Sequence, residues 1–295
     1  MVSGHALDPS GGKISKSKSN TPVLPDALIA RHSADAMRYW ACRASLGGDQ
    51  LISEDAMRQG RRVINKLWSA GRLLGLQMAD GRWQIEPGNL QWVDKALLSA
   101  LQQLIADTTA RMEAYEYAAA LERIERFFWD SFCDSYLELI KGRLYDSDAD
   151  GRAAALATAA TAFGVILKLL APFMPHITEE LHQRLFADGH GRLSSIHVAA
   201  WPTPDLALRD QEAERAGAAM QAMVAAVRRA KSAHKLSLGA PLAQLTLACA
   251  DEQLRAMLAA AARDLKAVTR ASILEIVAEG AGEELEPGLY IELRL

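Results

Sequence analysis

Long stretches of the chain repeat apolar side chains every three or four positions, the spacing that places them on one face of a helix. The connections between these stretches are short, which is typical of an antiparallel helical bundle. The sequence predicts helices over residues 26–46, 55–76, a periodic segment around 97–112, 118–144, 152–170, a segment starting at Pro175, and 210–233.

The pattern changes after residue 202. Residues 245–249, 272–278 and 288–295 alternate apolar and polar side chains as strands do, whereas residues 252–264 keep helical spacing. The expected fold class is therefore mainly α, an antiparallel helical bundle followed by a small C-terminal α+β domain.

Composition narrows the class of protein. Half of the 295 residues are apolar and 23% are charged, which is ordinary for a globular chain. The three cysteines are far apart and form no C-x-x-C pair, so neither a disulfide framework nor a zinc ribbon is expected. The longest apolar runs, near 164–174 and 216–227, are too short to cross a membrane. We expect a cytoplasmic protein with no membrane partner.

Charge is distributed unevenly, although the formal net charge is only −3. Residues 58–72 carry five cations and no acid, residues 228–235 carry four cations, and residues 107–150 carry eleven carboxylates against five bases. Such an uneven distribution is typical of a protein that binds a polyanion on its basic faces and repels it from its acidic faces. The candidate nucleic-acid contacts are Arg58, Arg62, Lys66, Arg72, Arg228, Lys231 and Lys235. The alternative for both clusters is a solvated cationic helix face.

Two tryptophans, and a group of acidic and histidine side chains, could serve a function but also have simple structural explanations. Trp83 and Trp92 follow the basic helix and are candidates for stacking on RNA bases, although core packing accounts for most tryptophans in a bundle. Asp130, Asp134 and Glu138 align on one helix face without a histidine, and His176 and His182 point to different sides of another helix. We expect no metal site.

The segment Gly11–Asn20 combines two glycines with lysines and hydroxyls, a composition suited to closing over a polyphosphate and neutralising its charge. A solvated basic tail has the same composition. Lys13-Ile14-Ser15-Lys16-Ser17 resembles the KMSKS signature of the class I aminoacyl-tRNA synthetases, with isoleucine in place of methionine and Ser19 in place of the later glycine. Residues 3–8 and 33–40 also resemble that family, and further segments are similar to its valyl branch: residues 65–68, 128–138, 170–181, 195–197 and 201–202.

The resemblance implies three domains: a catalytic-domain stub with a connecting helix over residues 1–50, an anticodon-binding bundle over 51–202, and a C-terminal helix with an α+β domain over 203–295. It implies that Lys13 and Lys16 act catalytically on the phosphates of ATP, with Ser15 and Ser17 supporting the loop. ATP with magnesium would be a substrate, and no cofactor would be tightly bound. The partner would be tRNA, that for valine.

No stretch of the sequence resembles the HIGH motif of the family, so the chain alone is not expected to activate an amino acid, and a catalytic N-terminal half is an expected partner. Two alternatives remain open: a stand-alone RNA-binding protein, and a helical interaction protein whose acidic face over residues 107–150 binds another protein. Salt-dependent tRNA binding separates the second alternative from the other two. Valine-dependent pyrophosphate exchange with an added N-terminal half separates the synthetase from the stand-alone binder.

Overall fold

A computed structural model describes residues 4–14, 25–78, 84–146, 149–186 and 194–294. The chain divides into two compact units. One comprises residues 1–81, 103–128 and 163–204, and the other comprises residues 82–102, 129–162 and 205–295.

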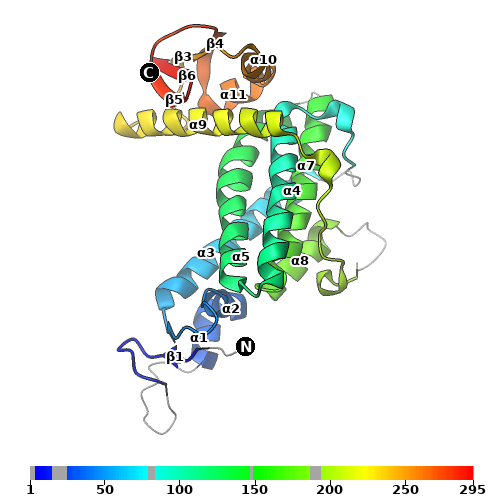
Figure 1. Ribbon diagram of the computed structural model, residues 1–295, viewed down its shortest axis with the longest axis vertical. Coiled ribbons are helices and arrows are strands. Elements are labelled where there is room, and N and C mark those ends of the chain that lie inside the picture. Colours follow the sequence, from blue (N-terminus) through cyan, green and yellow to red (C-terminus); the bar gives the residue numbers. More distant parts are fainter. Residues whose placement is uncertain (1–3, 15–24, 79–83, 147–148, 187–193, 295) are drawn as a thin grey trace. The chain divides into compact units, whose positions relative to one another are not determined.

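Helices dominate the described residues (Figure 1). The helices before residue 240 are α1 (Pro25–His32), α2 (Ala34–Cys42), α3 (Glu54–Gln77), α4 (Trp92–Glu113), α5 (Tyr117–Arg126), a π-helical segment (Phe127–Tyr136), α6 (Leu137–Leu144), α7 (Ala149–Leu170), α8 (Pro175–Phe186) and α9 (Gln211–Ala233). Single 3₁₀ turns lie at Pro87–Asn89, Ile196–Val198 and Leu206–Leu208. The predicted mainly α fold class is confirmed.

Local sequence explains where these helices begin and break. Ser53 caps α3, because its hydroxyl accepts a hydrogen bond from the Ala56 amide at 3.2 Å. The single helix expected over residues 26–46 is two helices, which is a correction. Ser33 adopts a φ of 84° between them and caps α2 through the Ala36 amide.

In the first unit, two polar side chains of α2, the buried Asp35 and the exposed Arg38, bind backbone groups of neighbouring segments. The Asp35 carboxylate accepts hydrogen bonds from the amides of His176 (3.2 Å) and Ile177 (2.7 Å), so it caps the first turn of α8. Arg38 donates to the carbonyls of Pro172 and Phe173, at 2.7 and 3.2 Å. This segment, which carries part of the family resemblance, therefore has a structural role in the described residues.

In the second unit, a four-stranded sheet has the order β4-β3-β6-β5. Strand β3 (Leu242–Cys249) is parallel to β4 (Ala271–Val277) and antiparallel to β6 (Leu289–Arg294), and β5 (Glu283–Glu286) pairs with β6. Helices α10 (Glu252–Ala260) and α11 (Ala262–Thr269) connect the parallel strands. The predicted α+β character of this part of the chain is confirmed, whereas β5 was not expected.

A charged cluster lies in the core of the second unit. Arg143 on α6 is 1% exposed, and it donates to both carboxylate oxygens of Asp94, at 2.8 and 3.0 Å. Its Nε also lies 3.1 Å from Asp264 on α11, and Tyr136 donates to Asp94 at 2.7 Å. Two buried carboxylates thus share one guanidinium. Burial raises the pKa of Asp264 to about 6, although the charge of Arg143 opposes the shift.

The raised pKa of Asp264 predicts an unusual pH dependence of stability. The folded chain binds the Asp264 proton more tightly than the unfolded chain does. Protonation of Asp264 therefore stabilises the folded chain fully below pH 4, and this contribution to the free energy of unfolding is lost as the pH rises through about 6. We expect Asp264→Asn to raise the free energy of unfolding at pH 7.5 by on the order of 3 kcal/mol, and to change it little at pH 4. Urea denaturation at both pH values measures this. Equal changes at the two pH values would contradict the prediction.

One helix of the described chain, Gly151–Leu170, is long and apolar enough to cross a membrane by length and composition, with a mean hydropathy of 1.9. The prediction that the apolar runs are too short to cross a membrane is therefore wrong for this helix. In its most apolar stretch of 18 residues, 72% of the residues are buried inside the protein, and the core helix of a globular protein has the same length and composition. The helix lies in α7, whose Phe163, Ile166 and Leu167 are fully buried.

Candidate nucleic-acid interface

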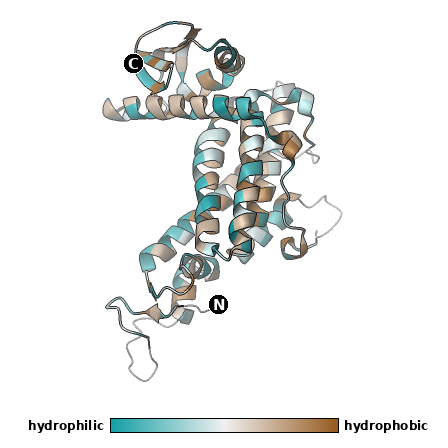
Figure 2. Cartoon of the chain, in the orientation of Figure 1, coloured by the Kyte–Doolittle hydropathy of each residue, from teal (hydrophilic) through white to brown (hydrophobic). Residues whose placement is uncertain are grey.

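Helix α3 carries a stripe of exposed cationic and polar side chains along one side. Positions three and four apart on a helix lie on the same face, and the exposed positions of α3 follow that spacing. Figure 2 shows the hydrophilic character of this helix. We call the following residues the α3 basic stripe: Arg58, Arg61, Arg62, Asn65, Trp68, Ser69 and Arg72. Lys66 lies at its edge and is half-buried.

Two arginines of the stripe are engaged within the protein. Arg58 contacts Asp55 directly and Glu54 at 3.8 Å, and Arg61 donates to the carbonyl of Arg31 at 3.0 Å. Arg62 and Arg72 form no ion pair with any carboxylate among the described residues. They lie about 15 Å apart along the helix axis. The structure therefore leaves two exposed guanidinium groups on one face, where each can bind an oxyanion through two hydrogen bonds.

Trp68 is more exposed than its sequence pattern indicates. Helical spacing groups it with Ile64, Leu67 and Leu74 on the apolar face of the helix, yet it is 39% exposed, and the guanidinium of Arg184 lies 5.2 Å from its ring centre. The reason is the close approach of α8. A Cβ on Gly71 would lie 2.6 Å from Leu181, so leucines of α8 occupy the space beside α3 and leave the indole outside. An exposed aromatic ring among cations is typical of surfaces that stack RNA bases.

The other two aromatic candidates contribute less to this interface. Trp83 lies outside the described residues. Trp92 begins α4 and is half-buried, with the ammonium of Lys95 4.7 Å from its ring centre.

The prediction of an RNA contact is wrong for Lys231. Its side chain is 1% exposed, and its ammonium donates to three carbonyls, those of Leu238 (3.0 Å), Ala240 (2.7 Å) and Thr269 (2.9 Å). These bonds use every donor of the ammonium and tie α9 to the turn before β3 and to the end of α11. Burial, and secondarily the charge of Arg270, lowers the pKa of Lys231.

The other two basic candidates of this cluster reach the surface. Lys235 is exposed just beyond the end of α9, with a φ of 57°. Arg228 is half-buried and donates to the carbonyl of Asp134 at 2.9 Å, which leaves other guanidinium donors available. Helical spacing alone grouped Lys231 with these two residues, and it does not report how deeply a side chain is buried.

The candidate phosphate-binding loop is described only up to residue 14. Lys13 is exposed and forms an isolated β-bridge with Leu7. The preceding turn is held by Asp8, whose carboxylate accepts hydrogen bonds from the amides of Ser10 (2.8 Å) and Gly12 (2.9 Å). Three of the predicted site residues, Ser15, Lys16 and Ser17, lie outside the described residues.

Side chains of the acidic and histidine patterns form hydrogen bonds and ion pairs within the protein. Glu138 pairs with Lys141 at 2.5 Å, and His176 contacts Asp35 at 2.8 Å through Nδ1. Glu179 accepts hydrogen bonds from the Ile196 amide and the Ser195 hydroxyl. Burial raises the pKa of Glu179, but these bonds outweigh it and lower the pKa overall. Across the described part of the chain, no three such side chains are arranged to hold a metal ion.

A family model described as the anticodon-binding domain of tRNA ligase matches residues 94–247, more than half of the 295 residues. A solved structure with a similar fold is a LeuRS of Agrobacterium radiobacter K84 in a ternary complex with tRNA and LeuAMS. It has a TM-score of 0.55 and 21% identity, and the match covers 70% of this chain and 24% of that chain.

Curated relatives with higher identity carry the name valine–tRNA ligase. The relative from Orientia tsutsugamushi is 35% identical over 94% of this chain, and the match covers 34% of its own length. The relative from Thermobifida fusca is 38% identical over 83% of this chain and 27% of its own length. The chain therefore spans about a third of these relatives, and it matches their C-terminal portion.

Proposed function

Because the chain belongs to the family of anticodon-binding domains of tRNA ligases, we propose that it binds tRNA as the C-terminal portion of a valine–tRNA ligase. The proposed nucleic acid is the tRNA for valine. The observation that carries the proposal is the α3 basic stripe, in which exposed Arg62 and Arg72 flank the half-exposed indole of Trp68.

Each part of the stripe has a distinct task in this proposal. Arg62 and Arg72 bind phosphates of the RNA backbone, which supplies affinity without reading sequence. Trp68 stacks on an unpaired base, and Arg184 above its ring can extend the stack. Arg58 and Lys66 add positive charge at the edges of the stripe, and Arg228 and Lys235 supply the contacts proposed for the second unit.

The reaction proposed for the whole enzyme joins valine to its tRNA at the expense of ATP in the cytoplasm. Lys13 and Lys16 would bind the ATP phosphates and stabilise the charge that develops as pyrophosphate leaves, and Ser15 and Ser17 would hold the loop. Magnesium accompanies ATP as part of the substrate. A catalytic N-terminal half would supply the remainder of the ATP site.

Replacing Trp68 tests the stacking contact. We expect Trp68→Ala to weaken binding of the tRNA for valine by about tenfold or more, because one base–aromatic stack contributes about 1–3 kcal/mol. Trp68→Phe keeps a ring and should retain most of the affinity. Fluorescence anisotropy of labelled tRNA with the full chain measures each constant.

The matched control is Leu76→Ala, which removes another exposed apolar side chain from α3, one that is 72% exposed. It should leave the affinity unchanged. Equal affinities for wild type, Trp68→Ala and Leu76→Ala would contradict a stacking role for Trp68.

A further inference from the structure

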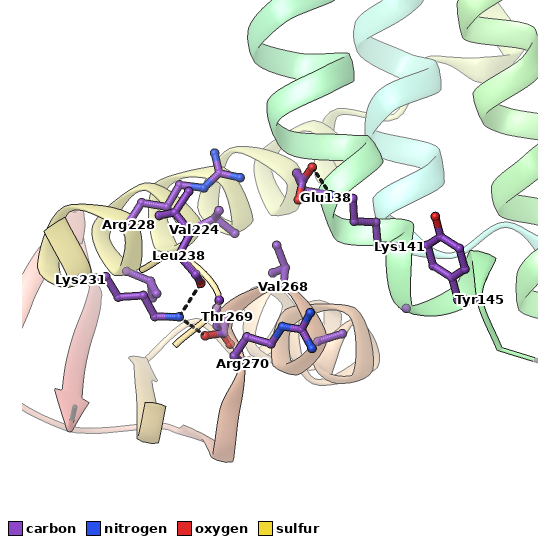
Figure 3. Close-up of a pocket in the computed structure, with 14 residues that line it drawn as sticks. Glu138, Lys141, Tyr145, Val224, Arg228, Lys231, Leu238, Val268, Thr269 and Arg270 are labelled. Carbon is purple, nitrogen blue, oxygen red and sulfur yellow. Dashed lines mark hydrogen bonds and ion pairs between the residues drawn. The ribbon is translucent and has the colours of Figure 1, made fainter. Parts of the chain in front are cut away.

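The second unit contains a cavity of about 440 Å³ among α6, α9 and α11 (Figure 3). Much of its wall is apolar, formed by Val224, Val227, Leu238, Ala267 and Val268. Helices α6 and α11 approach closely beside it, because Gly142 lacks a side chain: a Cβ there would lie 3.1 Å from that of Ala267. The cavity therefore offers an apolar surface between helices.

Cations surround this apolar wall. Arg228, Arg270 and Lys141 line the cavity, and Glu138 is its one lining carboxylate, already paired with Lys141 at 2.5 Å. No carboxylate among the described residues forms an ion pair with Arg228 or Arg270. The cavity thus presents positive charge that internal ion pairs do not neutralise, which favours an anionic ligand.

Lys231 offsets the partial negative charge at the carbonyl end of α11, which would otherwise repel an anion. The carbonyl ends of helices carry partial negative charge, and α11 ends at this cavity with Thr269. The ammonium of Lys231 binds the carbonyl of Thr269 and those of Leu238 and Ala240. The backbone oxygens of Leu238, Ala240 and Thr269 are therefore covered by a buried ammonium, which forms no ion pair with a carboxylate in the described part of the chain.

The backbone at Arg270 is also unusual. Arg270 ends α11 with a φ of 59°, a conformation in which glycine or asparagine is the common choice. This left-handed backbone conformation is less favourable for arginine than for glycine. The side chain of Arg270 lines the cavity opposite Arg228 (Figure 3). Tyr145, a residue that is 69% exposed, also lines the cavity.

We propose that this cavity binds one unpaired nucleotide of the RNA. The base contacts the wall formed by Val224 and Val268, and the adjoining phosphate binds Arg228 and Arg270. An apolar wall with cations around it matches the flat base and charged phosphate of a nucleotide. This inference rests on the proposed function, which supplies RNA as the class of ligand. It adds a binding site in the second unit to the α3 basic stripe of the first unit.

Titration of the full chain with free nucleotides tests the cavity without tRNA. The valine methyl groups are labelled with ¹³C, and the four nucleoside monophosphates and inorganic phosphate are added separately. We expect at least one nucleotide to shift the Val224 and Val268 signals saturably, inorganic phosphate to leave them in place, and Arg270→Gln to weaken the nucleotide titration. Unmoved valine signals with all four nucleotides, or equal shifts with inorganic phosphate, would overturn the proposal.

A second measurement uses tRNA. Arg270→Gln should weaken binding of the tRNA for valine by roughly tenfold, the effect of losing one charge-assisted contact. The matched control is Arg229→Gln, which removes a neighbouring charge of α9 that pairs with Glu283 at 2.7 Å and does not line the cavity. Equal affinities of the two variants would overturn the proposal. Failure of the wild-type chain to bind tRNA would instead contradict the proposed function. The nucleotide titration would still test whether the cavity binds a nucleotide.

Discussion

Replacing Arg143 by methionine should lower the free energy of unfolding by about 3–5 kcal/mol at pH 7.5. The guanidinium holds Asp94 through two hydrogen bonds and lies 3.1 Å from Asp264, and all three side chains are at most 1% exposed. Methionine fills much of the same volume but leaves two carboxylates buried without a cation. Urea denaturation of the full chain measures the loss.

The loss should shrink at pH 4, because protonation of Asp264 removes one of the two uncompensated charges. The matched control is Arg263→Met, which breaks an ion pair with Asp146 whose two side chains are 48% and 47% exposed. Exposed pairs contribute at most about 1 kcal/mol. A loss for Arg143→Met no larger than the loss for Arg263→Met would contradict a structural role for the cluster.

Reversing two charges on α3 should weaken tRNA binding by about 100-fold or more. The double variant Arg62→Glu/Arg72→Glu removes two proposed phosphate contacts, each contributing about 1.5 kcal/mol or more, and places repelling carboxylates on the stripe. Both side chains are exposed, so we expect the melting temperature to change little. Fluorescence anisotropy and thermal denaturation measure the two effects separately.

The control for net charge is Arg126→Glu/Arg294→Glu. These arginines are 62% and 67% exposed and lie on α5 and β6, outside the stripe. The control variant has the same net charge as the α3 variant, so general repulsion of tRNA would weaken both equally. Equal weakening would contradict a specific role for α3.

The periodicity of the sequence predicted most helices closely, because helical spacing and capping are local properties. The predicted helix over residues 55–76 is Glu54–Gln77 in the structure, and Ser53 supplies the cap. The break at Ser33 was not predicted, since it depends on a positive φ that serine seldom adopts. The π-helical turn over Phe127–Tyr136 was also missed, because its apolar positions still follow helical spacing.

The candidate site was predicted less completely, because burial depends on which neighbour occupies the adjacent space. Trp68 is exposed since leucines of α8 pack against Gly71, a contact between residues more than a hundred positions apart. Lys231 follows the same helical spacing as Arg228, yet its ammonium is enclosed by the carbonyls of Leu238 and Ala240, just beyond the helix, and of Thr269, which is 38 positions away. No pattern in the chain distinguishes such a buried lysine from an exposed one.

Salt dependence of tRNA binding by the full chain tests the central proposal, that the exposed cations of α3 bind the RNA backbone. The logarithm of the association constant for the tRNA for valine is measured against the logarithm of salt concentration, for wild type and for Arg62→Gln/Arg72→Gln. We predict a steep negative slope for wild type and a slope smaller by roughly two for the variant, one for each lost phosphate contact. Identical slopes for the two proteins, or no binding by wild type at low salt, would contradict the proposal.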